Sequence, residues 1–380
     1  MSDRKILFLM PNYKAFSEVW LQRMIEMIQS NVCLIGAYGT TESLWREQIP
    51  VLDLTRLPLP IHLLNKFFPV VKDTDIFQVR KAVNYGLCDA VLIHYLEFAL
   101  KFESVWRSSN KPLFVHCHGY DITWDLRMHQ EPSSLRFGSE YVSAVRRLSE
   151  KAVLIANSKF TFQKLVDIGV PEERVVTKYL GVPVPEFPLK RNKQNSKIEI
   201  LYLGRLMDFK APDLVLRAFE LACEQGLDGH LTIAGDGELR VACELLYRRS
   251  KYRDRITLLG KVDPVESEQL RTKADIFTAH NCKGILSHQE EAFGVSIIEA
   301  MASALPVISA RSGALSETVI DGVTGFLVNP GDIEAHAEAF ITLANDPDLR
   351  FQMGSAAWKR VKENFSYERE RLELRQILGI

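Results

Sequence analysis

Short apolar runs alternate with amphipathic stretches along the whole chain, and this alternation restricts the fold more than any other feature. In the first half, the candidate strands are residues 5–10, 31–35, 90–94, 112–118, 152–156 and 175–180. Stretches with the spacing of an amphipathic helix, such as 18–29 and 159–167, lie between several of them. This pattern favours a parallel sheet with helices on both faces.

The same alternation starts again in the second half of the chain. Its candidate strands are residues 198–203, 230–234, 256–259, 275–278, 306–309 and 325–328. Between the halves, residues 183–188 contain three prolines and residues 190–197 are polar or charged, a composition typical of a linker. The tail, from about residue 346, has the pattern of charged helices without a strand. We therefore predict two doubly wound α/β domains that face each other across a cleft, with functional loops at the carboxyl ends of their strands.

Composition agrees with two domains and excludes several classes of protein. The chain has 380 residues, of which 47% are hydrophobic and 25% charged, as in an ordinary soluble globular protein. Its net charge of −1 gives no general attraction to nucleic acid. No segment approaches the ~20 apolar residues of a membrane span, and residues 6–10 are too short for a signal-peptide core. The six cysteines include no Cys-x-x-Cys pair, which indicates reduced thiols in a cytoplasmic protein.

Two glutamates, Glu291 and Glu299, flank the start of an apolar helix. The helix is expected to begin near Val295 and to end before Pro306, because proline lacks an N–H and restricts the residue before it. The free N–H groups of the first turn suit a phosphate, and Gly294 leaves room for a ligand. Both carboxylates can then flank a phosphorylated sugar. An ordinary helix with two exposed glutamates is the competing interpretation, and spacing alone leaves both open.

Cations and glycines occupy two further junctions between a strand and a helix. Arg205 and Lys210 follow the first strand of the second half and can reach a diphosphate, arginine as a planar fork and lysine as a point charge. Solvated loop cations are the alternative interpretation. Gly235 and Asp236 begin a tight turn after the next strand, where the missing side chain permits close approach of a ligand.

Polar residues also end the fourth candidate strand of the first half. His118 and Asp121 are placed to meet a substrate at the edge of the sheet. The consecutive residues His116, Cys117 and His118 suggest a metal site, but neighbouring strand residues alternate faces, so we expect no metal there. His94 ends another strand, although a single histidine is more often structural.

Taken together, these segments resemble the retaining glycosyltransferases of family 4. The motifs that carry the resemblance are Arg205 with Lys210, residues 235–237, 291–302, 305–309, 313–317 and 321–328. The resemblance is strong over about 198–340, and in the first half it depends on residues 118–121 and 156–158. It implies a GT-B fold of two Rossmann-like domains, and transfer of a sugar from a nucleotide-activated donor to an acceptor hydroxyl with retention of configuration.

The resemblance also implies a division of the chain and roles for individual residues. The domains would be an acceptor-side domain at 1–187, a linker at 188–197, a donor-binding domain at 198–350, and C-terminal helices at 351–380 that pack back on the first domain. Catalytic roles would fall to Arg205, Lys210, His118 and Glu291; donor binding to Gly204, Gly235, Asp236, Phe293, Gly294, Val295 and Glu299; and the acceptor side to Ser17, Glu18 and Asp121.

Within this scheme, Glu299 binds the ribose of the nucleotide and Glu291 the hydroxyls of the donor sugar. Arg205 and Lys210 stabilise the charge that develops on the leaving diphosphate. No protein base is required, because the leaving phosphate itself helps to deprotonate the acceptor. Residues 11–18 lack the glycines that the family often carries there, so the acceptor side departs from the usual pattern.

The expected partners are a UDP- or GDP-linked sugar and a carbohydrate or lipid-linked acceptor, in the synthesis of a polysaccharide, glycolipid or other glycoconjugate. No Asp-x-Asp motif is apparent, so no metal or other cofactor is expected, and nucleic acid is not an expected partner. The expected location is the cytoplasm. Peripheral contact with the inner face of the membrane through the apolar stretch 61–72 is a weaker interpretation than a buried helix or loop.

Two other functions remain open at this point. A nucleotide-sugar epimerase can use the same scaffold, since a fold does not determine a function. A non-catalytic binding subunit is the second alternative, but the presence of Arg205, Lys210, Glu291 and Glu299 together argues against it.

Overall fold

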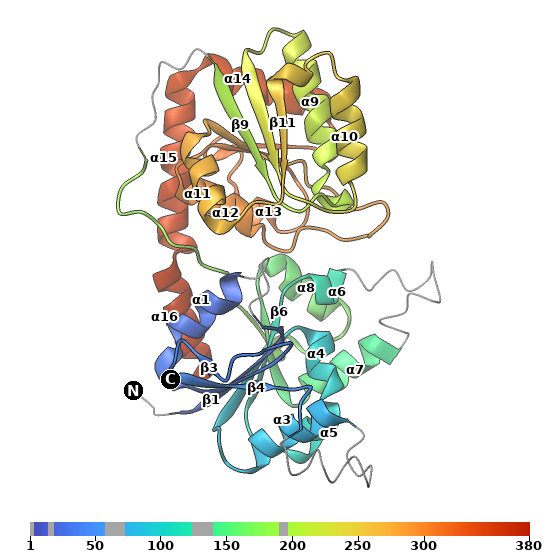
Figure 1. Cartoon of the computed structure of the whole chain (residues 1–380), viewed down its shortest axis with the longest axis vertical. Coiled ribbons are helices and arrows are strands. Elements are labelled where there is room, and N and C mark those ends of the chain that lie inside the picture. Colours follow the sequence, from blue (N-terminus) through green and yellow to red (C-terminus); the bar gives the residue numbers. More distant parts are fainter. Residues whose placement is uncertain (1–3, 14–18, 58–72, 124–139, 190–196) are drawn as a thin grey trace. The chain divides into compact units, whose positions relative to one another are not determined.

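The computed structural model describes residues 4–13, 19–57, 73–123, 140–189 and 197–380. The chain forms two compact units, whose elements are labelled in Figure 1. The first unit comprises Met1–Asn157, Thr161–Lys178 and Glu370–Ile380, and the second comprises Ser158–Phe160 and Tyr179–Arg369. Each unit has its own sheet and its own hydrophobic core.

The sheet of the first unit has the strand order β3-β4-β2-β1-β5-β6-β7-β8 in the part of the chain that the structure describes. Its strands are β1 (Ile6–Asn12), β2 (Val32–Tyr38), β3 (Leu44–Trp45), β4 (Ile49–Asp53), β5 (Ala90–His94), β6 (Leu113–Cys117), β7 (Ala152–Ala156) and β8 (Val175–Thr177). All neighbours pair in parallel except β3 with β4. Strands β5 and β6 are buried along their whole length, as expected for a parallel sheet covered on both faces.

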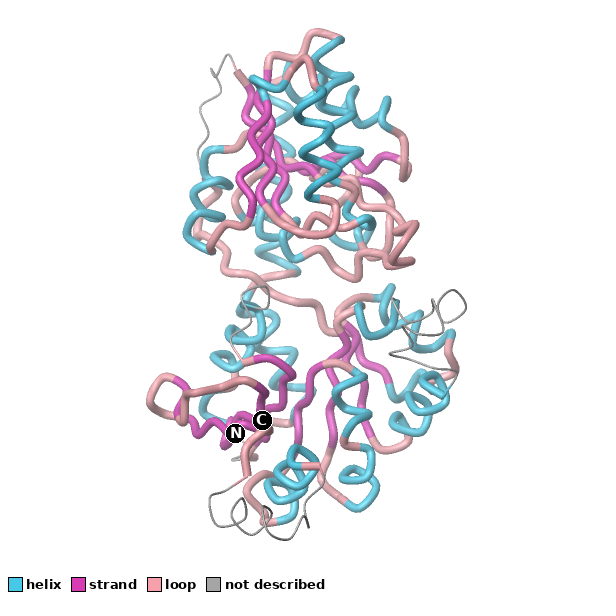
Figure 2. Tube along the Cα trace, turned by 45° about the vertical axis from the view of Figure 1, so that its right-hand side comes forward, coloured by secondary structure: helices cyan, strands magenta, loops and turns pink. Residues whose placement is uncertain are grey.

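Helices cover the faces of this sheet, and Figure 2 shows helices on both sides of the strands in each unit. Those of the first unit are α1 (Val19–Met27), α3 (Thr74–Asn84), α4 (Leu96–Lys101), α5 (Glu103–Ser108), α6 (Tyr120–Thr123), α7 (Glu140–Ser149), α8 (Lys159–Asp167), which begins in the short segment assigned to the second unit, and most of α16 (Tyr367–Leu378).

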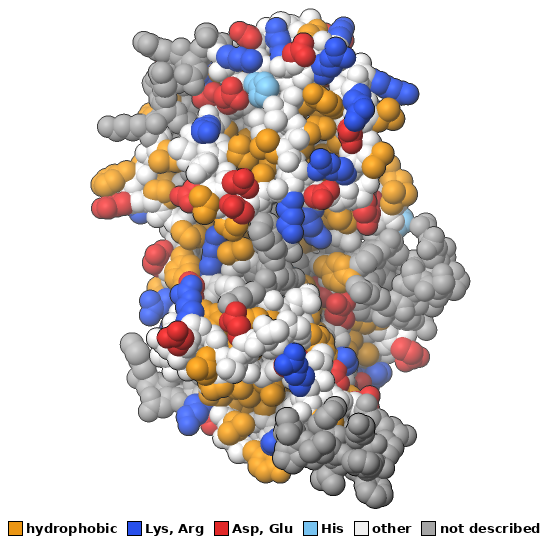
Figure 3. All heavy atoms as spheres, viewed as in Figure 1, with side chains coloured by type: hydrophobic (Ala, Val, Ile, Leu, Met, Phe, Trp, Pro, Cys, Tyr) orange, Lys and Arg blue, Asp and Glu red, His pale blue; other side chains and the backbone are white. Residues whose placement is uncertain are grey.

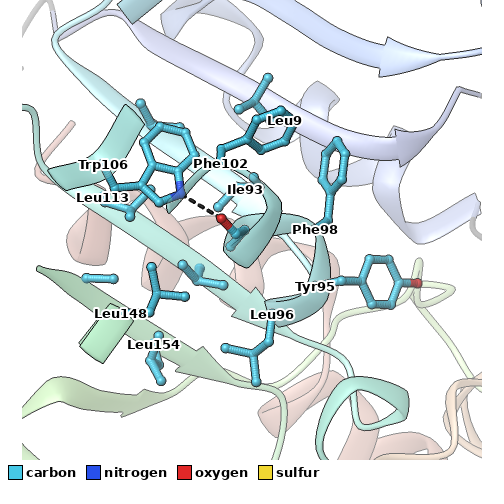
Figure 4. Close-up of a cluster of buried hydrophobic side chains, with 14 of the residues drawn as sticks. Leu9, Ile93, Tyr95, Leu96, Phe98, Phe102, Trp106, Leu113, Leu148 and Leu154 are labelled. Carbon is cyan, nitrogen blue, oxygen red and sulfur yellow. Dashed lines mark hydrogen bonds between the residues drawn. The ribbon is translucent and has the colours of Figure 1, made fainter. Parts of the chain in front are cut away.

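The core of the first unit is rich in aromatic side chains. Phe102 lies edge to face with Phe98 and Trp106, with ring centroids 5.1 and 6.0 Å apart. The Trp106 indole donates a 2.7 Å hydrogen bond to the Ala99 carbonyl, dashed in Figure 4, so its polar atom is satisfied within the core. Leu9 brings the central strand β1 into the same cluster.

The second unit has a fully parallel sheet with the order β11-β10-β9-β12-β13-β14 in its described residues. Its strands are β9 (Ile198–Leu203), β10 (Gly229–Ala234), β11 (Ile256–Gly260), β12 (Ile276–Thr278), β13 (Val307–Ala310) and β14 (Gly325–Val328). Its helices are α9 (Pro212–Glu224), α10 (Arg240–Arg249), α11 (Pro264–Lys273), α12 (Val295–Ala302), α13 (Leu315–Thr318), α14 (Ile333–Asn345) and α15 (Pro347–Asn364).

Each sheet reverses its strand order beside the first strand of its unit. Strand β1 lies between β2 and β5, and strand β9 lies between β10 and β12. Chain crossovers leave such a point in opposite directions, which opens a space for ligands beyond the carboxyl ends of the strands. We call the carboxyl ends of β1 and β5 the first switch point, and those of β9 and β12 the second switch point.

The predicted doubly wound α/β class is confirmed, and most predicted strands agree with the structure within two residues. Strands β3 and β4 were not predicted. They are short, β3 is the edge strand and β4 lies next to it. Pro50 lies ahead of the β4 residues that pair with β2, which run from Val51 to Asp53, a position where the missing N–H of proline is tolerated. The predicted start of a helix at Val295 and its end before Pro306 are confirmed, since α12 runs from Val295 to Ala302.

The prediction for the C-terminal helices is correct for α16 but wrong for α15. Residues 370–380 belong to the first unit, where Arg375 donates to Asn31 over 3.3 Å and the Lys178 ammonium pairs with Glu370. Helix α15 belongs instead to the second unit, where it packs against α12. A helix packs against its neighbours through an apolar face, and in α15 this face consists of Met353, Ala357 and Val361.

Several predictions fall on residues outside the described part of the chain. These are the acceptor-side residues Ser17 and Glu18, the apolar stretch 61–72, and most of the linker at 188–197. The last crossing between the compact units ahead of that linker is between Lys178 and Tyr179. Among the described helices, none has the length and apolar character needed to cross a bilayer. Basic and acidic side chains are interspersed on the face shown in Figure 3.

Candidate functional site

Helix α12 begins at the second switch point with a glycine in the left-handed conformation. Gly294 has φ 84° and ψ 58°, a conformation that residues with a Cβ rarely adopt. A Cβ at this position would also lie 2.9 Å from the Leu315 side chain. The amides of Ile297 and Ile298 donate back to the Gly294 carbonyl, so the helix starts abruptly after the glycine. The amides of the residues before Ile297 have no acceptor within the helix itself.

An ion pair joins the loops that follow β9 and β12. Lys210 is the last residue of the 3₁₀ turn Asp208–Lys210. Its ammonium group donates to Glu291 Oε2 over 2.5 Å. Both side chains are largely buried, at 15% and 12% exposure. Asn281 Nδ2 donates to the same carboxylate oxygen over 3.0 Å, and Ser309 Oγ donates to Asn281 Oδ1 over 3.3 Å. Lys210 and Asn281 thus hold the Glu291 carboxylate in one orientation, and Ser309 of β13 orients Asn281.

The Glu291 carboxylate is ionised in this environment. Burial raises its pKa, but the charge and hydrogen bond of Lys210, together with the charge of Arg205 and the Phe293 amide, outweigh burial and lower the pKa below its usual value. Arg205 is exposed, and its guanidinium has no ion pair or hydrogen bond among the described residues. The second switch point therefore presents two cations and one carboxylate, a combination that attracts an anion.

Asp208 fixes the loop that leads to Glu291. Its carboxylate accepts hydrogen bonds from the amides of Leu286 and Ser287, at 2.8 and 2.7 Å, and from the Ser287 hydroxyl at 2.6 Å. Burial raises the pKa of Asp208, but these hydrogen bonds outweigh it and lower the pKa overall. The loop is therefore tied to the same turn that carries Lys210.

Position 235 requires a glycine because its backbone lies close to the backbone of Gly204. A Cβ on Gly235 would lie 1.9 Å from the Gly204 carbonyl oxygen, and its φ of 152° also favours glycine. The Gly204 amide donates to the Ala234 carbonyl over 3.1 Å, and the Leu206 amide to the Asp236 carbonyl over 2.9 Å. The glycine turn thus supports the loop that carries Arg205, while the Asp236 side chain is exposed.

Glu299 is held by an arginine that the sequence did not identify. Arg271 of α11 lies 3.3 Å from Glu299 Oε2, and the two side chains are 11% and 21% exposed. Gly313 approaches the backbone of Glu291 so closely that a Cβ would lie 2.0 Å from its carbonyl oxygen. The Ala314 amide donates to that carbonyl over 2.8 Å. The stretch is therefore supported at Glu291 by the loop that contains Gly313 and at Glu299 by helix α11.

The two described first-unit residues of the predicted site, His118 and Asp121, lie at the end of β6. Asp121 is fully buried, and its carboxylate accepts from the amides of His118 and Leu96, each at 2.9 Å. Burial raises the pKa of Asp121 to about 6, and these backbone donors counteract part of that rise. Its carboxylate is thus engaged in joining the loops after β5 and β6.

The structure brings Lys210, Glu291 and the start of α12 together, as the sequence indicated. Sequence reasoning missed Asn281, Asp208 and Arg271, which hold the charged groups in place. No motif spacing signals these three residues. Asn281 could have been found from topology, because it follows β12 by three positions and β12 borders the second switch point.

Comparison with solved structures agrees with this arrangement. The chain is similar to Anabaena Alr3699/HepE, solved in complex with UDP and glucose, with 21% identity, a TM-score of 0.77 and 99% coverage of both chains. It is also similar to sucrose-phosphate synthase from Thermosynechococcus elongatus, with 19% identity, a TM-score of 0.76 and coverage of 99% and 98%. The chain therefore has the GT-B fold of glycosyltransferases.

Comparison with known sequences points to similar proteins. Residues 184–360 match the family described as glycosyl transferases group 1. The chain is 26% identical over 319 residues to N-acetyl-alpha-D-glucosaminyl L-malate synthase from Bacillus anthracis, covering 82% of this chain and 77% of that protein. It is 26% identical over 362 residues to D-inositol 3-phosphate glycosyltransferase from Pseudarthrobacter chlorophenolicus, covering 90% and 79%. Residues 184–360 are therefore similar to the glycosyl transferases of group 1.

Proposed function

We propose that the protein transfers a sugar from a nucleotide-activated donor to an acceptor hydroxyl with retention of anomeric configuration. The donor binds at the second switch point, and the product is part of a polysaccharide, glycolipid or other glycoconjugate. The observation that carries this proposal is the Lys210–Glu291 ion pair beside the start of α12. It combines a cation for a phosphate with an oriented carboxylate for sugar hydroxyls, within the region that matches the family.

The charges of the site suit the bond that breaks. In the reaction, the bond between the anomeric carbon and the phosphate oxygen breaks, and its electron pair stays on the diphosphate. A new bond forms between the anomeric carbon and the acceptor oxygen, whose proton passes to the leaving phosphate. Lys210 and Arg205 stabilise the negative charge that grows on the diphosphate, and the amides at the start of α12 contribute to the same effect.

The remaining residues orient the donor. Glu291, held by Asn281, accepts hydrogen bonds from hydroxyls of the transferred sugar. Glu299, held by Arg271, accepts from the ribose hydroxyls. The backbone of residues 293–295 approaches the diphosphate, for which the left-handed Gly294 leaves room. The assigned catalytic role of His118 and the acceptor-side roles of Asp121, Ser17 and Glu18 stay predictions, and so does independence of metal.

The relatives do not favour the two alternative functions. An epimerase would convert a nucleotide sugar without an acceptor, and a binding subunit would convert none. The curated relatives described above are named as a synthase and a glycosyltransferase. The structure of Anabaena Alr3699/HepE with UDP makes UDP-linked sugars the first donors to test.

The test begins with a panel of UDP- and GDP-linked sugars, each measured for its effect on the thermal unfolding of the full chain. A bound donor raises the unfolding free energy, by about 2.7 kcal/mol at a hundredfold excess over its dissociation constant. The donor that shifts the transition is then incubated with and without candidate acceptors. Acceptor-dependent release of the nucleotide is expected, whereas conversion without any acceptor would indicate an epimerase.

A matched pair of variants tests the site within the same assay. Glu299→Ala removes the predicted ribose contact and is expected to abolish the thermal shift and turnover. Glu334→Ala, an exposed glutamate in the first turn of α14, is the control and is expected to behave like the unmodified chain. Donor binding by Glu299→Ala at the level of the control would contradict the donor-site assignment.

A further inference from the structure

Buried histidines lie at the carboxyl edge of both sheets, and the two groups differ in their hydrogen bonds. In the first unit, His94 and His116 are register partners at the ends of β5 and β6, and the His116 ring stacks on that of His118 with centroids 4.3 Å apart. Burial lowers the pKa of all three well below the usual value, so they are uncharged. Four of their ring nitrogens have no partner among the described residues. This group is therefore not a closed hydrogen-bonded network.

In the second unit, His280 and His336 belong to a chain of hydrogen bonds in which every ring nitrogen has a partner. His280 Nδ1 lies 2.8 Å from His336 Nδ1, and His336 Nε2 lies 2.8 Å from Thr278 Oγ1. The Gly331 amide donates to His280 Nε2 over 2.8 Å. The ring centroids are 5.0 Å apart, so the two rings meet at their edges instead of stacking. Thr278, His280 and His336 are fully buried, and they join the end of β12 to α14.

One backbone amide determines which ring nitrogens carry protons. An amide N–H can only donate, so His280 Nε2 is an acceptor and the proton of the neutral imidazole lies on Nδ1. This Nδ1–H donates to His336 Nδ1, which leaves the His336 proton on Nε2 to donate to the Thr278 hydroxyl. Burial lowers the pKa of His280 to about 4, although Asp332 opposes the change, and burial lowers the pKa of His336 well below its usual value. Both rings are therefore neutral at pH 7, and each bond in the chain has one direction.

This chain of hydrogen bonds fixes the segment that carries Asn281. Asn281 directly follows His280 and is 1% exposed, but its side chain has other partners. Its Nδ2 donates to Glu291 Oε2, and its Oδ1 accepts from Ser309 Oγ. The segment is thus held by α14 through His280 and by β13 through Asn281. A buried polar network in which every group is paired is rigid, so the Asn281 amide keeps one orientation toward Glu291.

We propose that His280 is a positioning residue for sugar transfer, which fixes Asn281 and, through it, the Glu291 carboxylate that binds the donor sugar. The inference rests on the proposed function, and it assigns a role to a residue that acts through another and not by contact with the substrate. A small displacement of an orienting group lowers the rate of a reaction, whereas the diphosphate and the ribose are assigned to other residues. The sequence does not signal this role, because His336 lies 56 positions from His280.

The first test compares two variants at position 280. His280→Phe retains a ring but removes both hydrogen bonds, whereas His280→Gln retains an acceptor for the Gly331 amide. We expect kcat/KM for the active nucleotide sugar to fall by about tenfold in His280→Phe, and His280→Gln to recover about threefold of that loss. The dissociation constant of the free nucleoside diphosphate, measured by calorimetry, should change by less than about threefold in both variants, because the diphosphate does not depend on the orientation of Glu291.

A matched control breaks another histidine–threonine hydrogen bond of the same sheet. His230→Phe removes the 2.8 Å contact between His230 Nε2 and Thr257 Oγ1, and it should transfer sugar as the unmodified chain does. Equal activity of His280→Phe and His230→Phe would overturn the positioning role and leave the proposed function intact. An equal loss of sugar transfer and of diphosphate affinity in His280→Phe would also overturn it, because that result indicates general damage to the second unit. Absence of transfer by the unmodified chain would overturn the proposed function and this inference with it.

A double-mutant cycle tests whether His280 acts through Asn281. If it does, the double variant His280→Phe with Asn281→Ala should lose no more activity than Asn281→Ala alone, because the two substitutions remove the same contact with Glu291. A merely structural defect would instead add to the effect of Asn281→Ala. Losses that multiply would therefore overturn the proposal.

A measurement on the unmodified chain keeps the proposal testable if the variants fail to fold. Nitrogen NMR of protein labelled with ¹⁵N-histidine distinguishes the two neutral tautomers of each of the nine histidines after their assignment. At pH 7, the proton is expected on Nδ1 of His280 and on Nε2 of His336. A proton on Nε2 of His280 would leave the Gly331 amide without its acceptor, and this result would overturn the proposal.

Discussion

In the second unit, the loops after β9 and β12 carry Lys210 and Glu291 as an ion pair, whereas the ends of β5 and β6 in the first unit carry three uncharged imidazoles. Both groups lie at the carboxyl edge of a parallel sheet, beside a switch point. The same strand topology therefore positions a charged lysine–glutamate pair in the second unit and uncharged imidazole rings in the first.

The two units also share a way of holding these groups. Asp208 accepts amides from the loop that leads to Glu291, and Asp121 accepts amides from the ends of β5 and β6. In both cases an aspartate carboxylate accepts hydrogen bonds from backbone amides of neighbouring segments and so holds these segments together. The comparison teaches that the scaffold at the two switch points is similar, and that the chemistry depends on the few side chains that project from it.

The largest expected effect tests the charged site. Lys210→Ala removes the ammonium that stabilises the diphosphate in the transition state, and we expect kcat for sugar transfer to fall by about 10²–10³-fold. Steady-state kinetics with the active donor measures this. Lys283→Ala, an exposed lysine on the neighbouring loop, is the matched control and should retain its activity. A Lys210→Ala enzyme within threefold of that control would remove Lys210 from the catalytic site.

The next effect concerns the backbone beneath the charged site. Gly235→Ala places a Cβ against the Gly204 carbonyl and strains a positive φ, so we expect the second unit to lose about 2–4 kcal/mol of unfolding free energy. Gly226→Ala is the control, because its φ is 100° but nothing lies within 4 Å of the added carbon. That variant should lose only about 1–2 kcal/mol, as measured by chemical denaturation. Equal losses would mean that the contact between β9 and β10 is not tight.

A smaller effect concerns the pH dependence of the second unit. Glu291 has a lowered pKa when folded, so its ionisation stabilises the fold above the usual carboxyl pKa and this contribution is lost as the pH falls through the folded value. Glu291→Gln should therefore lose about 1–3 kcal/mol at pH 7, and the difference from the unmodified chain should shrink below about pH 4.5. Denaturation at several pH values measures it. A difference that does not change with pH would contradict the ion pair.

The smallest expected effect has the opposite sign and belongs to the first unit. Asp121 has a pKa raised to about 6, so its contribution to stability is present below its usual pKa and is lost as the pH rises through about 6. Asp121→Asn should therefore remove a decline in the stability of the first unit between about pH 4 and pH 6. Thermal unfolding over that range measures the decline. If the variant declines as steeply as the unmodified chain, Asp121 is not the titrating group.

The comparison also shows which parts of the molecule could be predicted from sequence. A continuous apolar run such as that of β7 indicates its strand almost alone, because a strand that is buried on both faces is apolar at successive positions. The left-handed position at Gly294 and the helix after it were also predictable, since few other residues fit there.

The remainder depended on contacts between distant parts of the chain. Strand β4, next to the edge strand β3, gains its structure from pairing with β2, which its own residues do not signal. Arg271 joins Glu299 from 28 positions away, and His94 joins His118 from 24 positions away. No local pattern reports such a pair, so a single histidine and a clustered one look alike in the sequence.

The central claim is that a nucleotide sugar binds to the charged second switch point. Hydrogen–deuterium exchange of the full chain, with and without a saturating nucleotide sugar from the panel, tests it most directly. Slower exchange is expected in the peptides that cover residues 204–210 and 291–299, and this protection should be lost in Lys210→Ala. Saturation by the donor without any change in these two segments would contradict it.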